Sequence, residues 1–188
     1  MIEKVLIKED DEDRINPDNF KLIKKISTDR STSKYEVQEI NTQKIYLAKI
    51  LRRKKDETPK EQYQQFISSM LNEVNILREL NHPTIIQYVG YSGKGFESKP
   101  AILTAYGQNG TLNDAIEKMQ NPTKENEWEA TKIINIYGIA KGMSYLHERN
   151  IVHRNLNPLN IYEDENFYPL ISGFEYSVNL GENKQFSD

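Results

Sequence analysis

The sequence predicts an α+β fold built from two lobes. Two patterns lead to this prediction: short apolar runs with strand periodicity dominate the first half of the chain, and helical periodicity dominates the second half. Five strand-like runs, with one helix between the third and the fourth, precede a mainly helical part. That order of elements is typical of an α+β protein.

The expected strands are short and are separated by turn residues. Asn41 to Gln43 form the turn between the second and the third run, and a glycine-containing turn separates the last two. The five runs are FKLIKKI, SKYEVQEI, KIYLAKIL, TIIQYVGY and AILTAY, at residues 20–26, 33–40, 44–51, 84–91 and 101–106.

Three helices are expected. The first follows from apolar residues that recur at steps of three and four between Tyr63 and Leu80, and the NHP stretch ends it because a residue before proline disfavours the helical conformation. Thr111 and Asp114 are spaced as a capping box at the start of a short second helix. The third is expected from about Ala130 to Glu148, with one face formed by Ile133, Ile134, Tyr137, Ala140 and Met143.

Bulk properties exclude several classes of protein. A net charge of -3 gives no reason to expect nucleic-acid binding, and the absence of cysteine excludes disulfides and thiolate metal sites. No long apolar run predicts a membrane-spanning helix, and the acidic start does not resemble a signal peptide, so we expect a cytoplasmic protein. The basic run RRKKDETPK, at 52–60, is interpreted as a solvated connector rather than as a phosphate or membrane patch.

Several motifs, in this order along the chain, resemble those of the protein kinase family. YLAK ends in Lys49, which resembles the lysine of the family's third strand, and LNEVNILREL contains Glu73, which resembles its partner on the helix. ILTAYGQNGTL resembles the last strand of the small lobe, the hinge and the next helix start. GIAKGMSYLHERNIVHRNLNPLN resembles the long helix and the catalytic loop, and YPLISGFE occupies the position of the D-F-G motif.

The resemblance implies a bilobal protein-kinase-like fold. It implies an acidic N-terminal extension at 1–18, a small lobe with a five-stranded antiparallel sheet and one helix at 19–104, and the hinge with an incomplete, mainly helical large lobe at 105–188. The motifs are closest to those of tyrosine-kinase-like serine/threonine kinases. Because the chain ends at Asp188, inside the position of the activation segment, we expect the large lobe to be truncated and its long helix to expose an apolar patch.

Lys49 and Glu73 are retained where the family binds nucleotide phosphates. Kinases act mainly by positioning the nucleotide and neutralising charge on the transferred phosphoryl group. By the resemblance, Lys49 would hold α- and β-phosphate oxygens, and Glu73 would hold Lys49 through a charge-assisted pair. The alternative is that the two residues form only an ion pair that stabilises the lobe.

The glycine-rich loop of the family has lost its glycines in this chain. Its pattern falls on Ser27, Asp29 and Thr32, with Lys34 in place of the valine that covers the adenine ring. Glycine at these positions lets backbone N–H groups approach phosphates closely. Asp29 also places a negative charge where phosphate would sit, so we expect the affinity for ATP to fall.

Larger side chains stand at the two faces of the expected adenine pocket. Leu47 replaces the family's small alanine, and Tyr162 replaces the leucine beneath the adenine. Thr104 takes the gatekeeper position, and Ala105 and Gly107 follow it in the hinge. We expect Leu47 and Tyr162 to stack and to stand in for the purine. The alternative is a narrowed pocket that still binds nucleotide.

The catalytic loop and the metal site have lost their charged groups. Asn155 replaces the aspartate that accepts the substrate proton, and an amide oxygen takes up no proton near neutral pH. Asn157 replaces the lysine that neutralises the γ-phosphate. Asn160, which contacts one magnesium ion in the family, is retained, but Gly173 replaces the chelating aspartate, so we expect a non-functional metal site. Glu175 would reach the metal only with a rearranged backbone.

Other retained residues are interpreted as structural. His153 and Phe174, with Leu77 and Tyr88, map onto the interior stack that ties the helix of the small lobe to the large lobe in the family. Arg154 would brace the activation segment. The scaffold residues are thus present where the chemical groups are missing.

Three hypotheses follow for the function. The first is a catalytically inactive pseudokinase that acts as a binding or regulatory module, with no cofactor. The second is a weak or unusual serine/threonine kinase that transfers the γ-phosphate of ATP to protein and binds ATP and Mg²⁺. The third is a non-functional truncated fragment. We expect a protein partner or self-association through the exposed large-lobe surface, and neither nucleic acid nor membrane as a partner.

Overall fold

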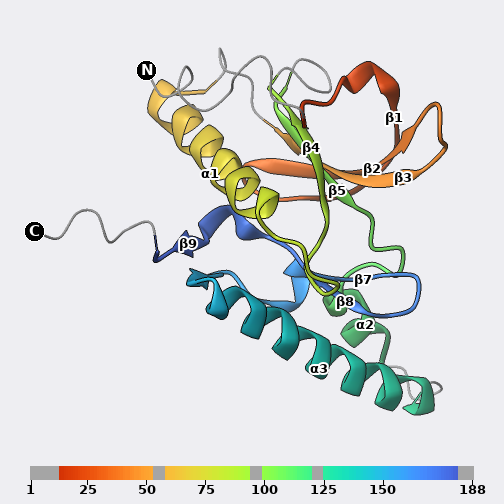
Figure 1. Cartoon of the computed structure of the whole chain (residues 1–188). Coiled ribbons are helices and arrows are strands. Elements are labelled where there is room, and N and C mark those ends of the chain that lie inside the picture. Colours follow the sequence, from red (N-terminus) through yellow and green to blue (C-terminus); the bar gives the residue numbers. More distant parts are fainter. Residues whose placement is uncertain (1–12, 53–57, 94–98, 120–124, 182–188) are drawn as a thin grey trace, which may run out of the picture. The chain divides into compact units, whose positions relative to one another are not determined.

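The chain divides into two units, which are described separately here (Figure 1). The structure is a computed structural model that describes residues 13–52, 58–93, 99–119 and 125–181. The first unit comprises Met1–Val74 and Tyr88–Tyr106, and the second comprises Asn75–Gln87 and Gly107–Asp188. Within the described ranges, no helix is long and apolar enough to cross a membrane.

The first unit is built on an antiparallel sheet of five strands, which confirms the predicted fold class. Neighbouring strands pair in the order β1-β2-β3-β5-β4. The turn between the second and the third strand lies where it is predicted, with Gln43 in the left-handed conformation at a φ of 60°. The strands are β1 Phe20–Thr28, β2 Thr32–Glu39, β3 Ile45–Leu51, β4 Tyr88–Ser92 and β5 Ala101–Ala105, preceded by the 3-10 turn η2 Pro17–Asn19.

Helix α1, Lys60–Arg78, packs its apolar stripe on one face of this sheet. Successive residues of a strand point to opposite sides of the sheet, and side chains are buried on both of these sides. Each fully buried aliphatic side chain stabilises the unit by about 1.5–3 kcal/mol. The helix face is formed by Leu51, Ile67, Met70, Leu71, Val74, Tyr91 and Ile102. The opposite face, which we call the outer face, is formed by Val37, Tyr46, Ala48, Ile50, Ala101 and Leu103.

One predicted strand is shorter than expected. The run at 84–91 is predicted to be a single strand, but β4 begins only at Tyr88. The residues before Tyr88 pair within the second unit, where the amide of Ile86 donates to the carbonyl of Ile171 at 2.9 Å and the amide of Ile171 donates to the carbonyl of Thr84 at 2.8 Å. The prediction is wrong for this segment because periodicity does not reveal with which strand an apolar run pairs.

In its described residues, the second unit combines two helices with two short antiparallel sheets. β6 pairs with β9, and β7 pairs with β8, so that the loops between them are held at both ends. The elements are α2 Leu112–Met119, α3 Glu125–Glu148, β6 Ile151–Val152, η6 Pro158–Asn160, β7 Ile161–Glu163, β8 Pro169–Ile171, η7 Phe174–Tyr176 and β9 Val178–Asn179.

The predicted capping box at the start of α2 is confirmed. The amide of Thr111 donates to the carboxylate of Asp114 at 2.8 Å, and the amide of Asp114 donates to the hydroxyl of Thr111 at 3.2 Å. Each side chain thus satisfies a backbone N–H that has no partner inside the helix. Gly110, with a φ of 86°, makes the turn that leads into this cap.

Two glycines let side chains from other segments approach α3 closely. A Cβ at Gly142 would lie 2.6 Å from Oγ1 of Thr84, and a Cβ at Gly138 would lie 2.5 Å from Cγ of Pro169. These glycines lie one turn apart on the buried side of the helix, together with Leu146. The packed side of α3 therefore includes Asn135, Gly138, Gly142 and Leu146, none of which belongs to the apolar face expected from the sequence.

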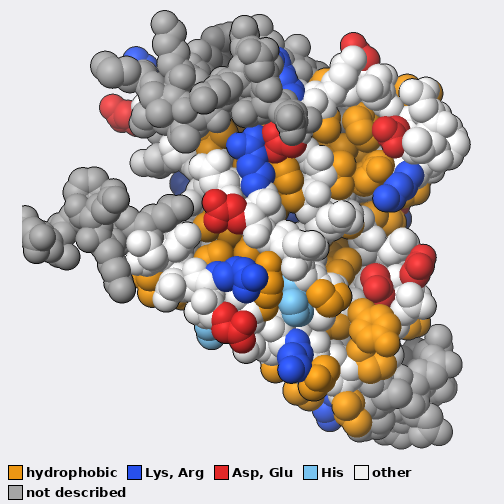
Figure 2. Space-filling model, in the orientation of Figure 1, with side chains coloured by type: hydrophobic (Ala, Val, Ile, Leu, Met, Phe, Trp, Pro, Cys, Tyr) orange, Lys and Arg blue, Asp and Glu red, His pale blue; other side chains and the backbone are white. Residues whose placement is uncertain are grey.

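The predicted face of α3 is wrong in part, since Ile133, Tyr137 and Ala140 are exposed while Ile134 and Met143 are half-buried. Ile133, Ile136 and Tyr137 are 67%, 61% and 64% exposed, and hydrophobic side chains are visible along the helix in Figure 2. The exposed apolar patch expected on the long helix is present in the described residues. The helix itself begins at Glu125, earlier than predicted.

Candidate functional site

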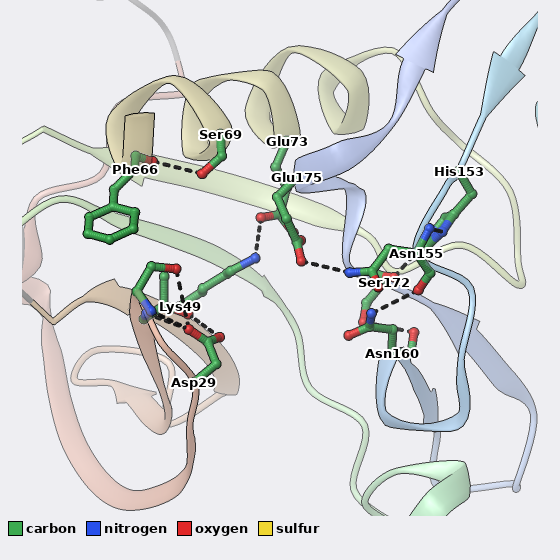
Figure 3. Close-up of polar contacts among 12 residues, drawn as sticks. Asp29, Lys49, Phe66, Ser69, Glu73, His153, Asn155, Asn160, Ser172 and Glu175 are labelled. Atoms are coloured by element: carbon green, nitrogen blue, oxygen red, sulfur yellow. Dashed lines mark hydrogen bonds and ion pairs between the residues drawn. The ribbon is translucent and has the colours of Figure 1, made fainter. Parts of the chain in front are cut away.

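Lys49 and Glu73 form an ion pair inside the first unit. Nζ of Lys49, on β3, lies 2.6 Å from Oε2 of Glu73, on α1, and the two side chains are 13% and 6% exposed (Figure 3). The pair is thus largely withdrawn from water. Removing one partner would leave the other charge buried without compensation, which typically destabilises a protein by about 3–5 kcal/mol.

The loop between β1 and β2 is closed by its own carboxylate. Oδ1 of Asp29 accepts hydrogen bonds from the amides of Ser31 at 2.8 Å and Thr32 at 2.6 Å, and Oδ2 accepts from the hydroxyl of Thr32 at 2.6 Å (Figure 3). The amide of Asp29 in turn donates to the carbonyl of Thr32 at 3.0 Å. The backbone N–H groups of this turn are therefore engaged with a negative charge that belongs to the chain.

The surroundings of Asp29 favour its ionised form. Partial burial by itself would raise the pKa of this carboxyl group, but the hydrogen bonds from Thr32 and Ser31 and the positive charge of Lys49 outweigh it and lower the pKa. Sequence reasoning placed a negative charge at Asp29 but missed this cap. The signal was available, because aspartate followed two and three residues later by serine and threonine favours a side-chain-closed turn.

Most of the predicted nucleotide residues of the first unit lie on one face of the sheet. Ser27 lies opposite Lys34, and Lys34 lies opposite Lys49 on the next strand. Leu47 lies opposite Thr104. Residues directly opposite each other on neighbouring strands point to the same side. This is the side that α1 covers, since Leu51, two residues after Lys49 on β3, points to the same side and packs on the helix.

The predicted nucleotide residues of the first unit differ in how deeply they are buried. Leu47 and Thr104 are 4% and 7% exposed, and Thr104 donates from its hydroxyl to the carbonyl of Ala105 at 3.3 Å. Ala105 lies opposite Tyr46. Ser27 is exposed on β1.

In the second unit, three asparagines and one glutamate bond to one another. Nδ2 of Asn155 donates to Oε1 of Glu175 at 2.9 Å (Figure 3). Nδ2 of Asn157 and Nδ2 of Asn160 both donate to the backbone carbonyl of Asn155 at 2.9 Å. We call these four residues the amide cluster. Glu175 was considered from the sequence only as a metal ligand, and the structure places its carboxylate on the amide of Asn155.

Gly173 leaves no room for a side chain beside this cluster. It has a left-handed backbone, with φ 83° and ψ 48°, and a Cβ there would lie 2.6 Å from Cγ and 2.7 Å from Nδ2 of Asn160. The carbonyl of Asn160 is itself held by the amide of Ser172 at 2.8 Å and its hydroxyl at 2.9 Å. A carboxylate-bearing residue at 173 would therefore strain the backbone and displace Asn160.

Tyr162 and Gly107 lie side by side in the second unit. Tyr162 is 2% exposed, and a Cβ at Gly107 would lie 2.6 Å from the Cβ of Tyr162. The amide of Asn109 donates to the carbonyl of Glu163 at 3.1 Å, which keeps the chain after Gly107 against β7. Since Leu47 belongs to the first unit and Tyr162 to the second, their stacking stays a prediction.

His153 and Phe174 form a buried aromatic contact. Their ring centroids lie 4.7 Å apart at an interplanar angle of 66°, and the two residues are 1% and 0% exposed. Nε2 of His153 lies 3.0 Å from the carbonyl of Ser172, while Nδ1 accepts from the amide of Asn155 at 3.1 Å. Nε2 therefore carries the proton. Burial lowers the pKa of His153 against the smaller effects of the Ser172 carbonyl and the charge of Glu175, which favours the neutral ring.

A buried acid under α3 was missed by sequence reasoning. Glu163 is 2% exposed and accepts a hydrogen bond from Nδ2 of Asn135 at 2.7 Å. Burial raises the pKa of Glu163, with a further contribution from Asp164, against the hydrogen bond of Asn135 and the charge of Lys118. The available signal was Asn135, which interrupts the apolar run IINIYG. A polar residue in such a run indicates that a polar partner is buried beside the helix.

Within the described residues, no group of three or more histidine, cysteine, aspartate or glutamate side chains is arranged to hold a metal ion. In the amide cluster, the retained Asn160 stands beside Gly173, which supplies no ligand atom from a side chain. Magnesium in proteins usually takes one or two carboxylates together with substrate phosphates. The cluster contains a single carboxylate, that of Glu175, and this group already accepts a hydrogen bond from the amide of Asn155.

The comparisons with known proteins identify the class. A family model described as "Protein kinase domain" matches residues 20–188, and that match covers most of the chain. With the five-stranded sheet, the Lys49–Glu73 pair and the loop that follows β6, it establishes that this chain belongs to the protein kinase family.

Individual relatives are receptor-type kinases by name. The chain is 41% identical over 109 residues to the putative serine/threonine-protein kinase/receptor R826 of Acanthamoeba polyphaga mimivirus, covering 56% of this chain and 6% of that protein. It is 35% identical over 107 residues to the PR5-like receptor kinase of Arabidopsis thaliana, with coverages of 55% and 15%. It is 31% identical over 108 residues to the tyrosine-protein kinase receptor svh-2 of Caenorhabditis elegans, with coverages of 57% and 10%. The matched part is thus a small share of each relative.

Proposed function

We propose that this protein is a pseudokinase, a kinase-fold module that binds or regulates a protein partner without transferring phosphate. The amide cluster carries the proposal. The position of the catalytic base holds Asn155, whose side-chain amide donates to Glu175. An amide cannot accept a proton near neutral pH, and the loss of a general base costs about 10²–10⁴ in rate.

The loop of the first unit supports the same proposal. Nucleotide phosphates would need free backbone N–H groups in this loop, but the amides of Ser31 and Thr32 already donate to Asp29. A phosphate would have to displace this carboxylate and also overcome its charge. The residues present therefore do not fit Mg²⁺-ATP. The expected filling of the adenine pocket by Leu47 and Tyr162 belongs to this proposal.

One observation favours the alternative of a weak or unusual serine/threonine kinase. The ion pair between Lys49 and Glu73 is intact at 2.6 Å, and in active members of the family such a pair positions phosphate oxygens. A buried pair also serves as a structural link, so it does not by itself require a nucleotide.

Transfer of radiolabelled phosphate from ATP separates the two functions. We expect incorporation into the chain and into general protein substrates to stay at the background level, and Lys49→Ala to leave that level unchanged. Turnover by the wild-type chain that Lys49→Ala abolishes would overturn the pseudokinase proposal. A purified chain without a cooperative thermal melt would support the third hypothesis, a non-functional fragment.

The proposal includes a protein partner or self-association, and a cytoplasmic location, both of which rest on sequence expectations. The exposed residues Ile133, Ile136 and Tyr137 of α3 offer an apolar surface for such contacts. Sedimentation of the wild-type chain and of a variant with serine at these three positions would test self-association. Fluorescence microscopy of a tagged chain would test the location.

A further inference from the structure

A cavity of about 170 Å³ opens on the outer face of the first unit's sheet. Three basic residues line it, Lys25, Arg52 and Lys99, and no carboxylate is among the lining residues that belong to the described ranges. Lys25 and Lys99 lie outside the candidate site described above, and Arg52 touches it only through hydrogen bonds to the backbone carbonyls of Asp29 and Ser31.

The fold brings the three cations together from distant parts of the sequence. Lys25 lies on β1 directly opposite Tyr35 on β2, with its Nζ 5.8 Å from the centre of the tyrosine ring. Arg52 follows the last residue of β3. The amide of Leu51 donates to the carbonyl of Pro100 at 2.9 Å, which keeps the residue before it, Lys99, next to Arg52.

The other lining residues add hydroxyl groups and an apolar floor. Ser33, 5% exposed, and Tyr35 carry hydroxyls on this face, and Leu22 and Ile50 supply apolar surface. Arg52 donates one hydrogen bond from Nη1 to the carbonyl of Asp29 at 2.8 Å. Because a guanidinium has five N–H donors, that bond orients the group and uses one donor only.

We propose that this cavity binds the phosphate group of a phosphorylated side chain on a partner protein. A phosphomonoester carries about two negative charges and three acceptor oxygens at neutral pH, which matches several converging cations and hydroxyls better than a carboxylate does. The apolar floor formed by Leu22 and Ile50 suits the carbon atoms of a peptide next to the phosphate. From the sequence, the run that begins at Arg52 is interpreted as a solvated connector. In the structure, its first residue, Arg52, lines this cavity.

Fluorescence anisotropy with a labelled peptide tests the proposal on the full chain. The probe is a short alanine- and glycine-based peptide with one phosphoserine next to a leucine, and the comparison peptide carries serine instead. We expect the phosphopeptide to bind at least about tenfold more tightly than the serine peptide, with binding that weakens as salt is added. The variant K25Q/K99Q should lose at least about tenfold in affinity.

The matched control is K21Q/K24Q, which removes two charges from the same strand, outside the cavity lining. We expect it to change the affinity by less than about twofold. Equal losses in both double variants would overturn the proposal, since only net charge would then matter. Equal binding of the two peptides would overturn it as well.

Two further probes decide the source of the phosphate. If inorganic phosphate competes only at a much higher concentration than the phosphopeptide, the ligand is a peptide. If inorganic phosphate and the phosphopeptide bind with equal affinity, the proposal of a peptide ligand is overturned. Vesicles that contain phosphatidylserine, if they bind through Lys25 and Lys99 while the phosphopeptide does not, would identify a membrane site instead. The outcome does not depend on phosphotransfer, so the pseudokinase proposal and this one fail separately.

Discussion

The carboxylate of Asp29 lies 2.6 Å from the backbone amide of Thr32. In a kinase-family chain, this is the loop whose N–H groups are expected to meet nucleotide phosphates. Here the chain supplies its own anion to them. The contact is local, and it is the structural reason why we expect ATP to bind poorly.

The first prediction concerns the stability that Asp29 provides. Because its hydrogen bonds hold the β1–β2 loop, Asp29→Ala should lower the free energy of unfolding by about 1–2 kcal/mol at pH 7. The folded-state pKa is lowered, so this contribution is present above the unfolded-state value and is lost as the pH falls through the folded-state value. Urea denaturation between pH 7 and pH 3 measures both effects. Asp18→Ala, on the exposed turn before β1, is the control, and an equal loss in both variants would contradict the prediction.

The second prediction concerns nucleotide binding. With the loop amides engaged by Asp29, we expect no rise in melting temperature when ATP is added, with or without magnesium. Asp29→Gly removes the carboxylate and restores the residue type that approaches phosphates closely. A thermal shift that ATP produces in the wild-type chain in the presence of a metal chelator would show nucleotide binding without metal and would contradict the filled-pocket prediction.

The third prediction concerns Gly173. Gly173→Ala should destabilise the second unit by roughly 1–3 kcal/mol, because alanine resists the left-handed backbone and its Cβ meets Asn160. Gly173→Asp should destabilise it as well, so restoring the family's aspartate will not by itself restore a metal site. Chemical denaturation measures the loss. Gly181→Ala serves as the control at a glycine without a positive φ, and unchanged stability of Gly173→Ala would refute this account.

The fourth prediction concerns the pair of Asn155 and Glu175. Asn155→Asp replaces a donor by a second carboxylate at the place of a 2.9 Å hydrogen bond, so we expect a loss of about 1–2 kcal/mol at neutral pH. Glu175→Gln in the same chain should recover most of it, since the glutamine amide can donate to the new aspartate. A double-mutant cycle gives the coupling energy. Additive effects of the two changes would show that the contact contributes nothing.

The fifth prediction concerns Glu163. Its folded-state pKa is raised above the ordinary value of 4.5, so its contribution to stability is fully present below that value and is lost as the pH rises through the folded-state pKa. The stability of Glu163→Gln relative to the wild type should therefore increase between pH 4 and pH 7. Denaturation at the two pH values measures the change. Glu165→Gln, at an exposed neighbouring site, should show none, and a constant difference for Glu163→Gln would refute the prediction.

Part of the fold was predictable because its signals are local. The strand runs, the stripe between Tyr63 and Leu80 and the capping box of Thr111 and Asp114 each depend on neighbours in sequence. The extent of the fourth strand was not, because its first residues pair with Ile171, far along the chain. The packed side of α3 was missed for a related reason: Gly138 and Gly142 mark a close approach, which a search for apolar residues overlooks.

The candidate site shows the same division. The sequence by itself determined the family, the five-stranded small lobe and the residue types at the family's functional positions, since motifs and periodicity are written in the order of residues. Only the tertiary structure decided that Asp29 caps its own loop, that Glu175 bonds to Asn155, that Gly173 has no space beside Asn160, and that Lys25, Arg52 and Lys99 share one cavity. These outcomes depend on distances and directions between side chains, which the chain acquires only when it folds.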